Sequence, residues 1–108
     1  MLYIDGTTIR MTRGDTVYLT VPLTSTTEAY EMGSSDTLTF SVKRRERDTE
    51  YVFQKVSQGN NSFHIEPSDT AALPFGVYKY DVQLNTGDGD VYTVIPPSTL
   101  ELLMEVTC

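Results

Sequence analysis

Few side chains in this sequence are of types that catalyse reactions, and their spacing supports none of the common mechanisms. A catalytic triad of nucleophile, histidine and carboxylate would have to use His64, because it is the single histidine of the chain. It alternates out of phase with Phe63 and Ile65, which predicts a solvent-facing histidine on a strand. No phosphate-binding glycine loop, CxxC pair or pair of carboxylates on one face is evident. We therefore expect no enzyme, no cofactor and no metal.

Two short motifs have both a functional and a structural explanation. Arg13-Gly14-Asp15 spells the tripeptide that integrins recognise, but a glycine turn that leads into a strand also explains it. Asp88-Gly89-Asp90, with Asn85 nearby, has the oxygen-rich composition of a calcium loop. It lacks the alternating acidic ligands and the closing glutamate of an EF-hand, so a hairpin turn is the preferred interpretation.

One basic cluster interrupts an otherwise acidic chain. At the tip of a hairpin such charges are usually solvated, but they could also dock on an acidic face of a neighbouring subunit. The candidate protein-contact residues are therefore Lys43, Arg44, Arg45 and Arg47.

Composition predicts one folded domain over residues 1–108. The chain has 8 Lys and Arg against 15 Asp and Glu, which gives a net charge of −7. Because binding to nucleic acid depends on cations that neutralise phosphates, this balance argues against nucleic acid as a partner. With 39% hydrophobic residues the chain can fill a core, so disorder is not expected.

The single cysteine, Cys108, allows no disulfide within the chain, so we expect packing alone to hold the fold. The first residues lack the basic and apolar regions of a signal peptide, and no stretch has the roughly 18 apolar residues of a membrane span. We expect a protein made in the cytoplasm, with no membrane partner.

Short alternating runs punctuated by Gly, Asp, Asn, Ser and Pro predict an all-β domain. A polar connection is expected over residues 25–36, one helical turn capped by Ser68 or Asp69 before Pro74, and a break at Pro96-Pro97. The expected strands cover residues 7–11, 16–23, 37–42, 50–56, 63–65, 77–85, 90–95 and 99–106. Their number and the chain length favour an immunoglobulin-like antiparallel β-sandwich of seven or eight strands.

A tyrosine corner would support this sandwich. Tyr78 follows the turn Leu73-Pro74-Phe75-Gly76, where its hydroxyl could return to the backbone just before the strand. A plain core aromatic is the alternative for Tyr78, and the sequence leaves both open.

Several runs together resemble one protein family. The corner residues within them are Asp69, Gly76, Tyr78 and Tyr80. The runs are Arg13-Gly14-Asp15-Thr16, residues 36–42 (DTLTFSV), residues 68–84 (SDTAALPFGVYKYDVQL) and residues 88–94 (DGDVYTV). They resemble the small immunoglobulin-like proteins of tailed-phage and prophage structural clusters, akin to the N-terminal domain of phage baseplate upper proteins.

The resemblance implies a noncatalytic structural role in the tail or baseplate of a phage particle. The implied partners are other phage structural proteins, with a homo-oligomer as a further possibility. No catalytic residue carries over, because the family pattern contains none. A bacterial binding module, either adhesive or carbohydrate-binding, is the alternative, and it predicts ligand affinity in the isolated monomer and an exposed aromatic platform.

Overall fold

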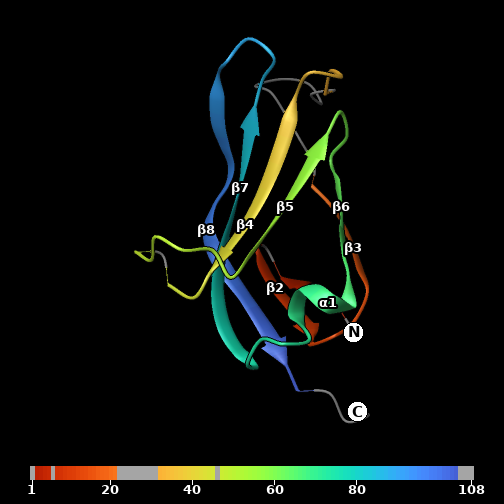
Figure 1. Cartoon of the computed structure of the whole chain (residues 1–108), viewed down its shortest axis with the longest axis vertical. Helices are drawn as coiled ribbons and strands as arrows, with labels where there is room; N and C mark the ends of the chain where they lie inside the picture. Colours follow the sequence, from red (N-terminus) through yellow and green to blue (C-terminus); the bar gives the residue numbers. More distant parts are fainter. Residues whose placement is uncertain (1, 6, 22–31, 46, 105–108) are drawn as a thin grey trace.

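The computed structural model describes residues 2–5, 7–21, 32–45 and 47–104, which form eight strands and one short helix (Figure 1). The helix is α1 (Pro67–Thr70). The strands are β1 (Leu2–Asp5), β2 (Thr8–Thr12), β3 (Val17–Thr20), β4 (Thr37–Lys43), β5 (Phe53–Gln58), β6 (Ser62–Ile65), β7 (Gly76–Asn85) and β8 (Val91–Leu103). Most of the expected connection at 25–36, the end of the expected strand 99–106 and Cys108 lie outside the described residues.

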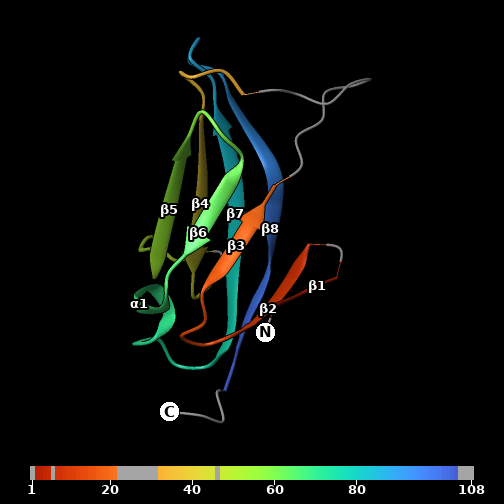
Figure 2. The same cartoon turned by 90° about the vertical axis from the view of Figure 1, so that its right-hand side faces the viewer.

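In the described part of the chain, the strands form two sheets. The larger has six strands in the order β1-β2-β8-β7-β4-β5, and the smaller pairs β3 with β6. Figure 2 shows the smaller sheet lying across one face of the larger one. The prediction of an all-β protein is confirmed.

One strand pair corrects the expectation of a purely antiparallel arrangement. β2 and β8 run parallel, with Ile9 opposite Leu100 and Met11 opposite Leu102, whereas the other pairs of described strands are antiparallel. These four side chains are buried, so the pairing is fixed by packing into the core. Local sequence does not encode the direction of a contact between strands at opposite ends of the chain.

Alternating side chains of the two sheets meet in one core. Phe40 of β4 is fully buried in it, with its ring centroid 5.7 Å from that of Phe63 in β6 and 5.2 Å from that of Tyr80 in β7. The rings are tilted, which is a favourable arrangement for aromatic pairs. Phe40 therefore joins the two layers. The other buried apolar residues are Ile9, Met11, Val17, Leu19, Val21, Leu38, Val42, Ile65, Tyr78, Val82, Leu84, Leu100 and Leu102.

The expected break at Pro96-Pro97 is wrong, because β8 continues through both prolines. The pairing of β8 with β7 shifts register near the two prolines instead. Tyr80 lies opposite Ser98, Val82 opposite Ile95 and Gln83 opposite Thr93. Between the first two pairs β8 advances three residues while β7 advances two, and between the next two pairs β8 advances two while β7 advances one. A proline cannot donate to a sheet ladder but fits extended backbone, so a bulged strand accommodates the pair without ending.

Two further elements, strand β1 and helix α1, differ from the sequence-based expectation. β1 was not expected, because four residues without alternating polarity give little strand signal. The helical turn is present as α1, but Glu66 is its N-cap rather than Ser68 or Asp69. Asp69 acts from inside the turn: its Oδ2 accepts the Glu66 N–H at 2.7 Å and lies 2.8 Å from Lys55 Nζ. The helix is thereby tied to strand β5.

The corner before β7 contains the hydrogen bond expected of a tyrosine corner. The hydroxyl of Tyr78, a residue only 1% exposed, donates to the carbonyl of Pro74 at 2.6 Å. Gly76 starts the strand at φ +142°, a conformation that side chains disfavour. Two residues on, the Tyr80 hydroxyl donates to the carbonyl of Thr7. The first bond closes the corner, and the second joins β7 to the segment that precedes β2.

Candidate functional site

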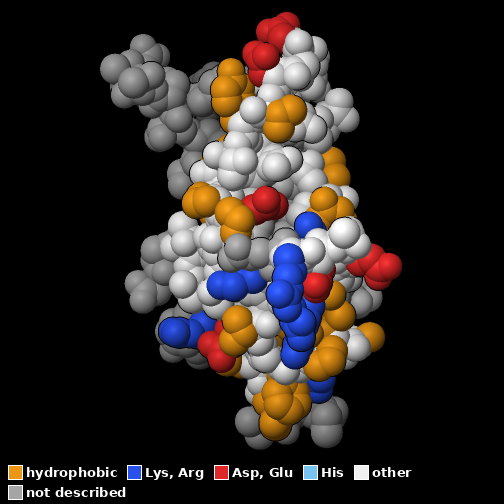
Figure 3. All heavy atoms as spheres, turned by 90° about the vertical axis from the view of Figure 1, so that its left-hand side faces the viewer, with side chains coloured by type: hydrophobic (Ala, Val, Ile, Leu, Met, Phe, Trp, Pro, Cys, Tyr) orange, Lys and Arg blue, Asp and Glu red, His pale blue; other side chains and the backbone are white. Residues whose placement is uncertain are grey.

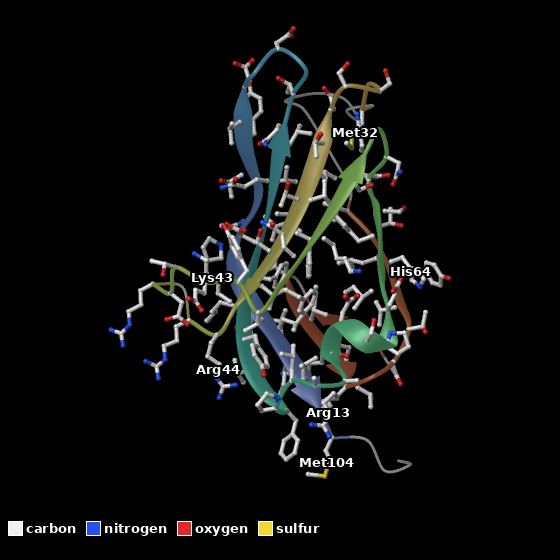
Figure 4. The ribbon with its side chains drawn as sticks, in the orientation of Figure 1. Arg13, Met32, Lys43, Arg44, His64 and Met104 are labelled. Atoms are coloured by element: carbon white, nitrogen blue, oxygen red, sulfur yellow. The ribbon has the colours of Figure 1, made fainter. Side chains whose placement is uncertain are left out.

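Two cations of the basic cluster lie against different aromatic rings of this chain. Lys43, the last residue of β4, places its Nζ 5.1 Å from the centre of the Tyr51 ring. Arg44 turns the other way, with its guanidinium carbon 5.0 Å from the centre of the Tyr78 ring at the corner. Figure 4 shows the two side chains pointing to different places. Two of the four candidate contact residues therefore pack against rings of this chain.

The other two cations of the cluster lie at the tip of the β4–β5 loop. Arg45 and Arg47 are exposed. A tight turn holds the loop, since the Arg45 N–H donates to Asp48 Oδ2 and the Asp48 N–H donates to the Arg45 carbonyl, both at 3.1 Å. This position suits either solvation or contact with an acidic neighbour, the two alternatives that the sequence left open.

The tripeptide Arg13-Gly14-Asp15 packs against the α1–β7 corner. An Arg13 guanidinium nitrogen donates to the Leu73 carbonyl at 3.1 Å, and the guanidinium lies 5.6 Å from the centre of the Phe75 ring. The Gly14 N–H donates to the Thr70 hydroxyl at 2.8 Å, and Gly14 has φ +83°. The motif thus forms a glycine turn that anchors the start of β3 to the helix.

His64 lies on the outer face of the smaller sheet, as its alternation with Phe63 and Ile65 predicts. It stands opposite Tyr18 in the β3–β6 register, and the two rings stack with centroids 4.5 Å apart and planes 7° from parallel. Figure 4 shows His64 on the side of the molecule away from Lys43. His64 therefore stacks on the ring of Tyr18, in a cross-strand pair typical of sheets.

Asp88-Gly89-Asp90 forms the turn between β7 and β8. The Gly89 N–H donates to the Thr86 carbonyl at 3.0 Å, and the Asp90 N–H donates to the Thr86 hydroxyl at 3.1 Å. Within the described residues, no group of three or more His, Cys, Asp or Glu side chains could hold a metal ion. The hairpin-turn interpretation accounts for this segment.

Asp36 is a structural residue that sequence reasoning missed. It is 7% exposed, and its two carboxylate oxygens accept the N–H groups of Gly33 and Gly87, each at 3.0 Å. Its backbone carbonyl also accepts the Gly59 N–H at 2.9 Å. One aspartate therefore joins three loops at one end of the molecule. An aspartate three residues after a glycine and just before a strand was the available signal.

A recess opens on the outer face of the larger sheet. Buried Phe40 and Tyr80 face the core, so their neighbours in β4 and β7 face outward. Figure 3 shows this face, where acidic and basic side chains lie among polar ones. The recess has a volume of about 390 Å³ and is lined by Thr39, Ser41, Lys43, Tyr51, Gln54, Lys79, Tyr80, Asp81, Gln83, Asn85 and Pro97.

Hydrogen bonds order several of these lining groups. The Gln54 amide donates to the Ser41 hydroxyl at 2.8 Å, and Lys79 Nζ donates to the Thr99 hydroxyl at 3.2 Å. Partial burial raises the pKa of the Asp81 carboxyl, and the Lys43 charge opposes this rise. A carboxylate is thus held where water solvates it incompletely. Of the lining residues, the sequence marked Lys43 as a contact residue and Tyr80 as a corner residue. The alternating polar positions of β4 and β7 were the signal for the other lining groups of these two strands.

A scan against protein-family models and a search of curated proteins found no match to this chain. In the described part of the chain, no helix is both long and apolar enough to cross a membrane.

Proposed function

We propose that this chain is a noncatalytic structural module of a tailed phage or prophage particle, and that it joins other structural proteins of the tail or baseplate. The proposal starts from the resemblance carried by the runs that include Arg13-Gly14-Asp15 and the Tyr78 corner. We also propose that the two sheets are a variant of the immunoglobulin-like sandwich. The hydrogen bond from Tyr78 to Pro74 and the passage from the smaller to the larger sheet through α1 support this assignment.

The observation that carries the assembly role is the open outer edge of β1. β1 is an end strand of the six-stranded sheet and pairs, among the described strands, only with β2. Figure 2 shows the β1–β2 hairpin standing out to one side of the smaller sheet. An end strand offers unpaired backbone groups, to which a strand of another protein can add.

The opposite end of the sheet is protected against such pairing. Lys55 of β5 belongs to the inward set of its strand and forms an ion pair with Asp69 at 2.8 Å. An inward-facing charge on an edge strand hinders the approach of a second chain. We therefore assign the joint to β1 rather than to β5, with Arg45 and Arg47 as a second contact for an acidic neighbour.

Peptide mass spectrometry on density-purified particles of a phage that encodes this chain tests the role. We expect the chain at a fixed ratio to the tail proteins. Reproducible absence from intact particles would refute the virion role and would favour the free binding module.

Proline substitutions test the joint separately. Successive residues of an edge strand direct their N–H groups alternately to the partner and outward, so Tyr3→Pro and Ile4→Pro together sample both directions. We expect the variant that loses an outward N–H to stay folded by circular dichroism but to fail to enter particles. Tyr3→Ala and Ile4→Ala, which keep the N–H groups, are the controls. Normal incorporation of both folded proline variants would exclude the β1 edge.

A further inference from the structure

We infer that the recess on the outer face of the six-stranded sheet is a saccharide-binding site, with Tyr51 as the stacking surface and Asp81, Gln83 and Asn85 as groups that bind hydroxyls. This inference goes beyond the assembly role and does not depend on it, because the isolated chain contains every residue involved.

The recess arises from an irregularity of the sheet. Asp81 lies between Tyr80 and Val82, where β8 carries its extra residues and the pairing of β7 with β8 is interrupted. Pro97, one of the two prolines at this bulge, lines the recess. Bulges bend strands and redirect side chains, and they occur often beside binding sites. The hollow of about 390 Å³ is within the range of about 300–1,000 Å³ typical of small-molecule sites.

The lining selects a ligand rich in hydroxyl groups. Small-molecule pockets are mostly apolar with a few polar groups. Here the strands supply hydroxyl, amide, ammonium and carboxylate groups instead, from Ser41, Gln54, Lys79, Asp81 and Gln83. A ligand that displaces water from such a surface must replace many hydrogen bonds, since unpaired polar groups would cost affinity. A sugar carries donors and acceptors around its ring and meets this requirement.

The aromatic ring supplies the apolar contact that a sugar also needs. Tyr51 keeps 51% of its surface exposed beside the polar groups. Lys43 Nζ lies 5.1 Å from the centre of its ring and favours a fixed ring position through a cation–π contact. A tyrosine presents an apolar body with a polar tip, which suits the C–H face and the hydroxyl rim of a pyranose.

The charges of the recess argue for a neutral ligand. Two cations, Lys43 and Lys79, and one carboxylate, Asp81, line the recess. Both cations already have partners, the Tyr51 ring and the Thr99 hydroxyl. A polyanion would need a larger excess of positive charge, whereas neutral hydroxyls bind well to a mixed set. The incompletely solvated Asp81 carboxylate can accept hydrogen bonds from two adjacent hydroxyls, which are stronger than bonds between neutral groups.

Amide NMR spectra of the isotopically labelled full chain test the site. The probes are glucose, galactose, rhamnose and N-acetylglucosamine with their disaccharides, up to about 10 mM, which would saturate a site with a Kd near 1 mM. We expect at least one sugar to shift amide signals of β4, β5 and β7 that surround the recess. An acidic peptide and inorganic phosphate are compared under the same conditions.

Two pairs of variants locate the binding. Tyr51→Ala and Asp81→Asn should each weaken the affinity about tenfold or more, as expected for loss of a stacking surface or of a charged acceptor. Tyr92→Ala, at a tyrosine that is 55% exposed outside the recess, and Asp88→Asn on the β7–β8 turn should leave it unchanged.

The inference is overturned if no sugar of the panel shifts the recess signals, if the shifts lie elsewhere, or if the two pairs of variants behave alike. Binding of the acidic peptide or of phosphate at the recess without any sugar would overturn it too. Because these measurements use the isolated chain, their failure leaves the particle-based test of the assembly role unaffected.

Discussion

Single polar side chains hold the irregular parts of this protein in place. Tyr78 connects the start of β7 to the preceding turn, Asp36 connects three loops, and Asp69 joins α1 to β5. Each accepts or donates at a position where backbone groups would otherwise lack partners inside the protein. Loss of such a bond is costly because the remaining partner stays desolvated.

Tyr78→Phe tests this at the corner. The variant removes the donor to the Pro74 carbonyl but keeps the ring against Arg44, so we expect a loss of about 1 kcal/mol in the free energy of unfolding. Urea denaturation measures it. Tyr92→Phe, at an exposed tyrosine, is the control and should change little. An equal effect of the two variants would mean that the corner bond contributes nothing.

Asp81 should make stability depend on pH. Its folded-state pKa lies above the ordinary value of 3.8, so the folded state holds the proton more tightly than the unfolded state. Stability from this group is therefore lost as pH rises from 3.8 through the folded pKa. We expect Asp81→Asn to stabilise the protein at neutral pH by up to about 0.5 kcal/mol, the usual scale for partly exposed sites.

The expected gain from Asp81→Asn vanishes below pH 3.8, where both states of the wild type are protonated. Urea denaturation at neutral and acidic pH measures the difference, with Asp88→Asn as the control for loss of one negative charge. A destabilised Asp81→Asn at neutral pH would contradict the direction of the shift.

At the scale of elements, the loops between strands are packed against one another rather than merely connecting. The β7–β8 turn lies against the turn before β4, because the Gly87 N–H donates to Asp36 and a Cβ on Gly87 would approach the Ser35 Cβ to 2.7 Å. That distance is shorter than side-chain contacts allow. The strand ends are thus fixed by contacts between loops distant in sequence.

Gly87→Ala should accordingly destabilise the protein by about 1–3 kcal/mol through overpacking. The added Ser35→Gly change should restore most of that loss, because it removes the atom that clashes. Gly33→Ala is the matched control, since its Cβ would meet only an Asp36 oxygen at 3.8 Å. Thermal unfolding compares the four proteins. Failure of Ser35→Gly to rescue would place the cost of Gly87→Ala elsewhere.

For the whole molecule, one aromatic core joins two sheets of unequal size. Two strands alone are too few for independent stability, so the β3–β6 sheet depends on its packing against the larger one. Phe40 carries that packing through its contact with Phe63. The two layers should therefore unfold together.

Phe40→Ala should cost about 3–5 kcal/mol, a large share of the roughly 5–15 kcal/mol typical of a domain. Circular dichroism in urea gives the magnitude, and amide exchange of β6 and β7 shows whether both sheets are weakened equally. Val56→Ala on an exposed position of β5 is the control. Loss of protection in β6 alone would indicate that the layers are independent.

The sequence by itself determined the all-β character, most of the strands, the outward position of His64 and the turns at Gly14 and Gly89. These follow from alternation of side chains along a strand and from the conformational freedom of glycine, which are local properties. The corner bond of Tyr78 was also within reach, because donor and acceptor are four residues apart.

Only the tertiary structure decided the parallel pairing of β2 with β8, the passage of β8 through its prolines, the division of the basic cluster and the recess around Asp81. Each depends on residues distant in the chain. Lys43 and Arg44 are adjacent in sequence, yet one packs on Tyr51 and the other on Tyr78, because neighbouring positions at the end of a strand face different surroundings. Packing in three dimensions selects those partners, and local pattern does not encode them.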